Sequence, residues 1–563
     1  MTRVIAGTAA FLLAAGAVQA QTSAGGPAAA ADLIVTARHI YTVDPDRPTV
    51  EALAVRGGLI AFAGSEREAM ALSGPRTRML RLGDATVIPG IVDAHLHLLG
   101  LGTALRTVDL TGTRSYATVV DRVVARARAA TAGEWIMGRG WDQNAWPDTR
   151  FPTEEALSRA VPDHPVALRR VDGHALLANA RALEAAGITA ATPDPPGGRI
   201  VRNADGSPTG VLVDNAMALV ERAVPPPSAE ELRARIVAAV AEVNRWGLTG
   251  IHDPGVTDGT IALYHELARA GRFSLRDYVM VAGDSDDVAS AFRRGPQQAL
   301  DDGHLWIRAI KLYADGAMGS RGAALLEDYS DDPGNRGLLV TDTNEIRRIA
   351  IEALRHGFQV CTHAIGDRGN RLTLDAYEAA LDSVPVADHR FRIEHAQVLS
   401  RQDIPRFAAL GVIPSMQTSH QTSDMYWIAN RLGPTRVLGA YAWRSLLNTG
   451  VVIPNGTDAP VEAVNPMIRF HAAVTRQDAD GWPAGGWFPA ERMTRDEALR
   501  SLTIWPAYAA FMEQVAGSLT PGKYADFTVL DRDIMTAAPE TILETQVVMT
   551  VLGGVPVYQR SAR

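Results

Sequence analysis

Two histidines separated by one residue, His95 and His97, close the sequence VIPGIVDAHLH. The apolar residues 87–92 before them have the composition of a buried β-strand. Because residues i and i+2 of a strand point to the same side, the two imidazoles are expected to emerge together at the strand end. Such a pair is half of a metal site, although a single His-x-His also occurs by chance.

Four more residues of related chemistry follow, each at the end of its own predicted strand: Lys311, His363, His395 and Asp458. Each has an ordinary interpretation when taken singly: an ion pair for the lysine, a hydrogen-bonded core residue for either histidine, a helix cap for the aspartate. Together with the first pair they predict a metal site at one rim. An ammonium would repel a cation, so Lys311 fits if carbon dioxide has converted it to an anionic carbamate that bridges two metals.

The chain has 563 residues, of which 47% are apolar and 21% are charged. This is the composition of an ordinary globular protein, long enough for more than one domain. The net charge of -8 and the lack of a basic run argue against nucleic-acid binding. The single cysteine, Cys361, excludes an intramolecular disulfide, and we interpret it as a buried small apolar residue rather than a nucleophile.

Strands alternate with helical periodicity through most of the chain, which predicts an α/β fold with a (β/α)₈ TIM-like barrel. The predicted strands lie near residues 88–95, 249–253, 277–281, 307–313, 358–363, 390–395, 411–416 and 451–457. Functional side chains of such barrels lie at the carboxyl ends of the strands. Residues 100–248 are too long for one crossover and are interpreted as an insertion after the first strand.

Both ends of the chain have β character, and we predict one small β-sandwich-like domain built from residues 32–86 and 518–563, with the barrel over residues 87–517. Residues 1–20 have the pattern of a secretory signal: Arg3, an apolar stretch over 4–18 and small residues before the cleavage point. We expect cleavage after Ala20, a linker over 21–31, an exported and periplasmic protein, and no membrane attachment after cleavage.

The chain resembles the amidohydrolase superfamily, and within it the family 3 branch of YtcJ-like proteins and N-substituted formamide deformylases. The resemblance covers nearly the whole mature chain. It rests on residues 89–97 (PGIVDAHLH), 311–317 (KLYADGA), 363–367 (HAIGD), 392–397 (RIEHAQ), 456–462 (GTDAPVE), 517–526 (GSLTPGKYAD), 138–142 (GRGWD) and 172–174 (DGH).

The resemblance implies a role for each ligand. His95 and His97 would bind the more buried metal with Asp458, His363 and His395 the more exposed one, and carbamylated Lys311 would bridge them. A metal-activated hydroxide would attack the substrate, with Asp458 as general base and then acid. Zinc is expected, as one or two ions, with manganese, iron and cobalt as alternatives.

The leading hypothesis is a metal-dependent hydrolase that cleaves the C–N bond of an amide, N-formyl or N-acyl substrate. Hydrolysis of an ester, lactone or carbamate at the same site is an alternative, and a non-catalytic metal- or ligand-binding protein is a second. His174 is a candidate hydrogen-bond donor to the substrate carbonyl, against a structural loop histidine. The candidates for substrate contact are Trp141 (against a core residue), Asp142, Met416, Gln417 and His420. The partner is a small molecule, and a homodimer is a family-level prediction.

Overall fold

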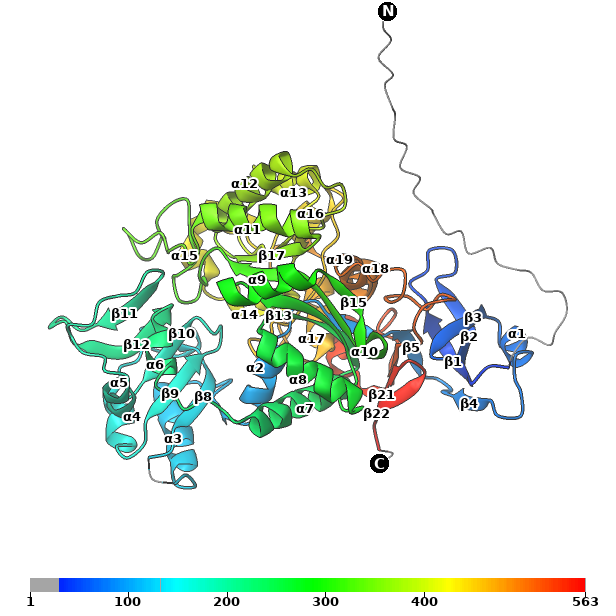
Figure 1. Ribbon diagram of the computed structural model, residues 1–563, viewed down its shortest axis with the longest axis horizontal. Helices are drawn as coiled ribbons and strands as arrows, with labels where there is room; N and C mark the ends of the chain where they lie inside the picture. Colours follow the sequence, from blue (N-terminus) through cyan, green and yellow to red (C-terminus); the bar gives the residue numbers. More distant parts are fainter. Residues whose placement is uncertain (1–29, 132, 562–563) are drawn as a thin grey trace, which may run out of the picture.

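The computed structural model describes residues 30–131 and 133–561. The predicted signal peptide and most of the predicted linker lie outside these residues. Ala31, the last residue of that predicted linker, is buried, and its amide donates to Leu72 O at 2.9 Å. Figure 1 shows the barrel in the middle, with one β-sheet at its right and a second at its left.

The first sheet joins strands from both ends of the chain, in the order β22-β21-β20-β5-β1-β2-β3, with β4 paired to β1. The turn at Gly57 and Gly58, both with positive φ, connects the antiparallel hairpin of β2 and β3. The strands are β1 Leu33–Tyr41, β2 Thr49–Arg56, β3 Leu59–Gly64, β4 Arg78–Arg81, β5 Thr86–Pro89, β20 Phe527–Leu530, β21 Val547–Leu552 and β22 Val555–Gln559.

The second sheet lies between the first two barrel strands in sequence, where the insertion is predicted. Its order is β11-β12-β10-β9-β8-β7. The helices α3 Tyr116–Ala127, α5 Ala180–Ala185 and α6 Met217–Glu221 pack against its strands, and α4 Glu155–Ala160 packs on α3 and α5. The strands are β7 Val108–Asp109, β8 Ile136–Trp141, β9 Val166–Arg170, β10 Ala175–Ala178, β11 Gly198–Arg202 and β12 Pro208–Asp214.

The third sheet forms the barrel wall, with parallel strands in the order β19-β18-β17-β16-β14-β13-β6 and β15 attached to β16. This confirms the predicted α/β barrel class. The strands are β6 Ile91–Asp93, β13 Leu248–Val256, β14 Arg276–Ala282, β15 Gln297–Ala299, β16 Leu305–Tyr313, β17 Gln359–Ala364, β18 Arg392–His395 and β19 Ile413–Ser415.

The predicted eighth strand, residues 451–457, is not a regular strand. Parallel bridges Met416↔Asn455 and Leu96↔Ala459 nevertheless connect this segment to β19 and to the end of β6, which closes the ring. Pro454 has no amide hydrogen, and the amide of Asn455 donates outside the ring to Ser501 O at 3.0 Å. The hydrogen-bond ladder is therefore interrupted within residues 451–457, where a continuous strand is predicted.

The first barrel strand is also shorter than predicted. The amide of Gly90 donates to Asp526 O at 2.9 Å, and β5 before it pairs with β20 and β1. Residues 86–89 thus belong to the first sheet, and the barrel begins at Ile91 rather than at residue 87.

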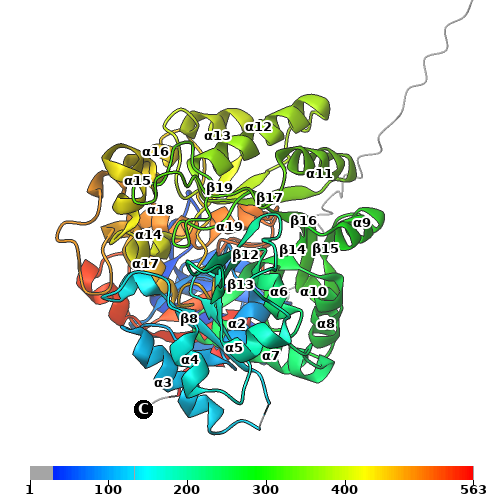
Figure 2. The same ribbon diagram turned by 90° about the vertical axis from the view of Figure 1, so that its left-hand side faces the viewer.

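Helices surround the barrel strands in Figure 2. Their apolar faces, among them those of α7 and α11, supply the main core. The helices after β13 are α8 Asp258–Arg269, α9 Ser285–Arg294, α10 Leu300–Gly303, α11 Thr343–His356, α12 Asp367–Ser383, α13 Ile404–Leu410, α14 Thr418–Asp424, α15 Ile428–Arg436, α16 Trp443–Leu447, α17 Pro466–Thr475, α18 Arg495–Ser501 and α19 Ile504–Ala509. Helices α1 Glu66–Met70, α2 Leu98–Ala104 and α7 Ala229–Arg245 precede it.

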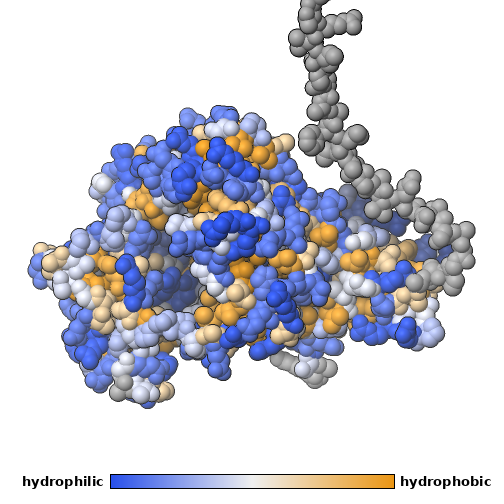
Figure 3. All heavy atoms as spheres, in the orientation of Figure 1, coloured by the Kyte–Doolittle hydropathy of each residue, from blue (hydrophilic) through white to orange (hydrophobic). Residues whose placement is uncertain are grey.

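Among the described residues, no helix has the length and apolar character needed to cross a membrane. Cys361 is buried in β17, and its thiol donates to Gln359 Oε1 at 3.2 Å. Burial raises the pKa of this thiol, which agrees with the core interpretation. Figure 3 shows a mostly hydrophilic face that is hollowed between the second sheet and the barrel.

Candidate metal centre

Three of the predicted ligands form a compact group at the barrel rim. The carboxylate Oδ1 of Asp458 lies 3.2 Å from His97 Nε2 and 3.6 Å from His95 Nε2. One ligand atom from each of the three residues falls within 4.8 Å of the other two. Two imidazoles and a carboxylate at this separation match the donor set of a divalent metal site.

The other three predicted ligands adjoin this group. The rings of His363 and His395 have centroids 4.6 Å apart, and His395 lies 4.9 Å from His95. The amine of Lys311 lies 3.3 Å from His95 Nε2. The structure therefore brings all six residues together. Lys311, His363 and His395 lie on β16, β17 and β18, respectively. His95 and His97 follow β6, and Asp458 lies in the segment after residue 453.

The orientation of three imidazoles leaves one nitrogen of each available to a metal. Nδ1 of His95 donates to Glu394 Oε2 (2.6 Å), Nδ1 of His97 donates to Pro254 O (3.1 Å), and Nδ1 of His395 donates to Gln417 Oε1 (2.8 Å). Since each of these oxygens accepts, the proton is on Nδ1 and the lone pair is on Nε2. A ligating histidine is commonly fixed in this way, so the residues present fit a metal.

The electrostatics also favour neutral ligands. Burial lowers the pKa of His95 to about 4, with a further contribution from Lys311. Burial likewise lowers the pKa of His363 and of His395 well below the usual range. Burial also lowers the pKa of Lys311, which favours the neutral amine.

Asp458 keeps its charge in the same surroundings. Burial would raise the pKa of its carboxyl, but the close approach of the His97 side chain, and then of His95, lowers it well below its usual value. Its backbone has a positive φ of 57°, and its amide donates to His95 O at 2.6 Å. This conformation turns the Asp458 carboxylate toward the two histidines. In an extended strand, alternation would point the side chain away from them.

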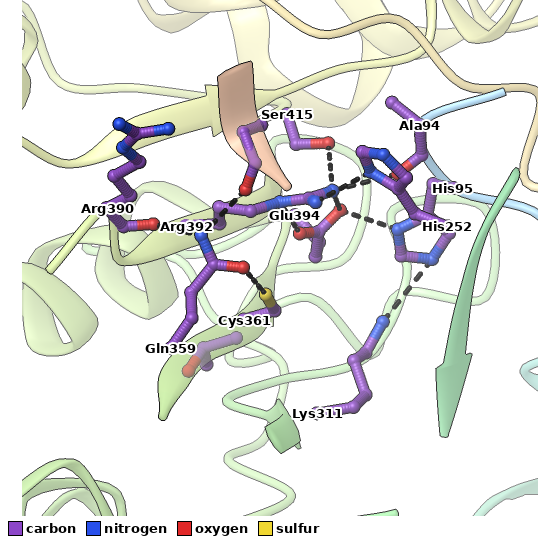
Figure 4. A network of polar contacts seen from close by, with 12 residues as sticks. Ala94, His95, His252, Lys311, Gln359, Cys361, Arg390, Arg392, Glu394 and Ser415 are labelled. Atoms are coloured by element: carbon purple, nitrogen blue, oxygen red, sulfur yellow. Dashed lines mark hydrogen bonds and ion pairs between the residues drawn. The ribbon is translucent and has the colours of Figure 1, made fainter. Parts of the chain in front are cut away.

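A buried ion pair lies directly behind His95 (Figure 4). Arg392 Nε lies 2.7 Å from Glu394 Oε1, and both side chains are fully buried. Other guanidinium nitrogens of Arg392 contact His252 Nδ1 at 2.9 Å and donate to Ala94 O at 2.8 Å. Burial would raise the pKa of Glu394, but Arg392 and His95 hold it far below its usual range. Glu394 is therefore an ionised acceptor that fixes the proton of His95 on Nδ1.

We expect Glu394→Gln to weaken zinc binding by about 10- to 100-fold. The neutral amide lacks the negative charge that makes His95 Nε2 a more basic metal ligand. The measurement is a zinc dissociation constant from competition with a chelator, with circular dichroism to show that the variant folds. Asp526→Asn is the matched control, because it breaks the buried Arg276–Asp526 pair away from the ligands. Equal zinc affinity of folded Glu394→Gln and wild type would contradict this role.

His174 reaches the site from the second sheet. Its Nδ1 lies 2.7 Å from Asp214 Oδ1, and its ring centroid is 5.1 Å from that of His363. Burial opposes protonation, but the hydrogen bond and charge of Asp214 raise the pKa of His174. This histidine is thus held as a donor beside the ligands, as required of a group that contacts a substrate oxygen. Its role in catalysis stays a prediction.

The five predicted substrate-contact residues fall into different places. Trp141 is fully buried in the core of the second sheet and donates to Leu168 O at 2.8 Å, which favours its core interpretation. Asp142 is ion-paired with Arg170.

The remaining three follow β19. Met416 is buried, and its backbone pairs with the segment that closes the barrel. Gln417 lies behind His395 as its hydrogen-bond acceptor. His420 stacks on His395 with ring centroids 5.9 Å apart, and its Nε2 has no hydrogen-bond partner in the described part of the chain, so it is the best placed of the five to meet a ligand.

Two residues that support the site were not predicted. Glu394 precedes a predicted ligand in the strand, and strand alternation would place it on the opposite face from His395. His395 has a positive φ of 74°, so both side chains face inward. Asp214 lies forty residues after His174, in another strand of the insertion. The RIEH sequence could have signalled Glu394, whereas nothing local signals Asp214.

The fold and the converging ligands together define a barrel-type metal-dependent hydrolase. Residues 81–558 match the amidohydrolase family, and the chain therefore belongs to that family. The predicted metal-dependent amidohydrolase, an enzyme of the class that hydrolyses carbon–nitrogen bonds, is confirmed.

Similar proteins extend over nearly the whole chain. The protein named amidohydrolase YtcJ of Bacillus subtilis is 34% identical over 93% of this chain and 98% of its own length. N-substituted formamide deformylase of Arthrobacter pascens is 31% identical over 94% of this chain and 99% of its own. The crystal structure of an uncharacterized metal-dependent hydrolase from Pyrococcus horikoshii has 27% identity and a TM-score of 0.73, covering 90% of this chain and 99% of that chain.

Proposed function

We propose that this enzyme hydrolyses the C–N bond of an N-formyl or N-acyl amine, with Asp458 as the group that moves the proton. The observation that carries the proposal is the position of the Asp458 carboxylate, 3.2 Å from His97 Nε2 and beside the other ligands. The name of the Arthrobacter pascens relative supports an N-substituted formamide as one substrate class.

The six residues would hold one or two divalent ions, with zinc favoured by the imidazole-rich set. Such ions lower the pKa of a water molecule and polarise a carbonyl oxygen. Asp458 accepts the proton of the attacking water and later donates it to the leaving nitrogen. His174, oriented by Asp214, donates a hydrogen bond to the carbonyl oxygen as negative charge develops there.

Lys311 is proposed to be a carbamate when metals are bound. The neutral amine attacks carbon dioxide, a C–N bond forms, and one proton leaves to solvent. The composition supports this choice: of 55 basic residues only two are lysines, Lys311 and Lys523. Arginine cannot lose its proton in a protein, so it could not react in this way. A lysine in a chain that otherwise uses arginine is therefore suited to covalent chemistry.

We expect the zinc-loaded protein to hydrolyse N-formylphenethylamine or its N-acetyl analogue faster than phenethyl formate, after each rate is divided by the uncatalysed rate. The reason is that Asp458 protonates a leaving amine, whereas an ester alcohol needs less assistance. Release of phenethylamine or phenethyl alcohol, measured by chromatography, tests this. Preference for the ester would favour the esterase alternative, and metal binding without turnover of any compound would favour a binding protein.

Export to the periplasm, with signal cleavage after Ala20, is proposed from the sequence of residues 1–20. Edman sequencing of protein recovered from the periplasm should begin at Gln21.

A further inference from the structure

Arg139 is delivered to the barrel rim by an irregularity in the second sheet. The pairing of β8 with β9 shifts register between Arg139 and Trp141, and Gly140 between them has a positive φ of 108°. Such a bulge redirects the adjacent side chains. The guanidinium then contacts two loops of the site: Nε donates to Pro460 O at 3.4 Å, two residues after Asp458, and Nη2 donates to Val171 O at 2.8 Å.

Arg139 has no carboxylate within ion-pair distance in the described part of the chain, although the charges of Asp458 and Asp172 act on it from farther away. Both of its hydrogen bonds go to backbone carbonyls. The neighbouring arginines of β9 differ, since Arg169 pairs with Glu221, and Arg170 pairs with Asp142 and Asp172. Among the described residues, Nη1 of Arg139 has no hydrogen-bond acceptor, and it lies against Gly173, where an added Cβ would be 3.4 Å from it.

A largely buried guanidinium that contacts no carboxylate is costly unless a ligand supplies a contacting anion. Burial lowers the pKa of Arg139 to about 10, with a further contribution from Arg169, so the group is still charged at neutral pH. Nη1 and the second hydrogen of Nη2 form one edge of the guanidinium fork. This edge has the geometry to bind a carboxylate through two parallel hydrogen bonds.

We propose that Arg139 binds a carboxylate on the leaving amine of the substrate, so that the preferred substrates are N-formyl or N-acyl amino acids rather than neutral amides. The inference rests on the proposed function, because the role of Asp458 as proton donor determines which end of the substrate lies near Arg139. Asp458 gives its proton to the leaving nitrogen, and Arg139 contacts the loop that carries Asp458. A substituent of that nitrogen is therefore the part of the substrate nearest to Arg139.

The test compares N-formyl-L-phenylalanine with N-formylphenethylamine, which lacks only the carboxylate. We expect wild-type kcat/KM to favour the acid by about 10- to 100-fold, as for one charge-assisted bidentate contact. Arg139→Gln should reduce this ratio to about one, mainly through KM for the acid. Arg139→Lys, which keeps the charge without the fork, should retain an intermediate ratio and serves if Arg139→Gln does not fold.

Arg122→Gln is the matched control, because the Arg122 guanidinium also donates only to backbone carbonyls, those of Asp109 and Thr111, but is exposed on α3. It should keep the wild-type ratio. A wild-type ratio near one, or a ratio unchanged in Arg139→Gln, would overturn the carboxylate site while leaving the hydrolase proposal intact.

If neither compound is hydrolysed, the proposed function fails. Calorimetric titration of the zinc-loaded protein with N-formyl-L-phenylalanine then tests the carboxylate site at Arg139 independently of turnover. Binding that Arg139→Gln weakens at least about tenfold would support the site. The absence of binding, or equal binding by the two proteins, would overturn it.

Discussion

Replacing Asp458 by asparagine is expected to slow hydrolysis of an N-formyl amine by about 10²- to 10⁴-fold while the metal stays bound. The amide oxygen can still face the cation and His97 Nε2, which lies 3.2 Å from Asp458 Oδ1 in the native protein. The amide nitrogen cannot take a proton from water or return one to the leaving nitrogen. Turnover at saturating zinc and metal content by mass spectrometry measure the two effects separately.

Two outcomes would contradict this role of Asp458. Undiminished turnover in Asp458→Asn would show that another group moves the proton. Loss of metal together with activity, not reversed by excess zinc, would show that Asp458 acts chiefly as a ligand. His174→Gln is an informative comparison, because it removes a different proposed contact while leaving the ligands in place; we expect a loss of about 10²- to 10³-fold.

Replacing Lys311 is expected to remove the second metal and most of the activity. Lys311→Arg keeps a positive charge but cannot react with carbon dioxide, so the bridging anion is lost. A buried cation then faces His95 Nε2, from which the native amine is 3.3 Å away. We expect zinc stoichiometry to fall from two to one or less, and kcat to fall by at least about 10²-fold.

The presence of only two lysines makes the carbamate directly observable. Protein loaded with zinc and carbon-13 bicarbonate should show one carbamate carbon signal by NMR. Lys311→Arg should abolish the signal, and Lys523→Arg should keep it, because the amine of Lys523 donates to Ala516 O in a different part of the chain. A signal that persists in Lys311→Arg, or none in the fully active wild type, would contradict the modification.

The sequence was sufficient to predict the barrel and the convergence of six residues because both follow from simple periodicities. Strand ends of a parallel barrel share one rim, so residues as distant as His97 and His363 can be assigned to one site without knowledge of the loops. The prediction failed where the backbone departs from that regularity. Pro454 interrupts the closing strand, and β5 leaves the barrel at Gly90 to join the first sheet.

The residues that support the ligands were harder to predict for the same reason. Alternation places Glu394 and His395 on opposite faces, and only the positive φ of His395 brings both inward. Asp214 and Arg139 depend on how the second sheet docks against the rim, which is a tertiary property without a local pattern. Trp141 is the opposite case. It lies in the GRGWD motif of residues 138–142 and was a candidate for substrate contact, but its side chain packs in the core of the second sheet.

Anomalous X-ray scattering from zinc-loaded crystals would show whether these six residues hold the catalytic metal. We predict one peak about 2.0–2.2 Å from His95 Nε2, His97 Nε2 and an oxygen of Asp458, and a second beside His363 and His395, with continuous density from Lys311 between them. Zinc bound elsewhere, with no peak within coordination distance of His95 and His97 in crystals of active enzyme, would contradict the assignment of the site.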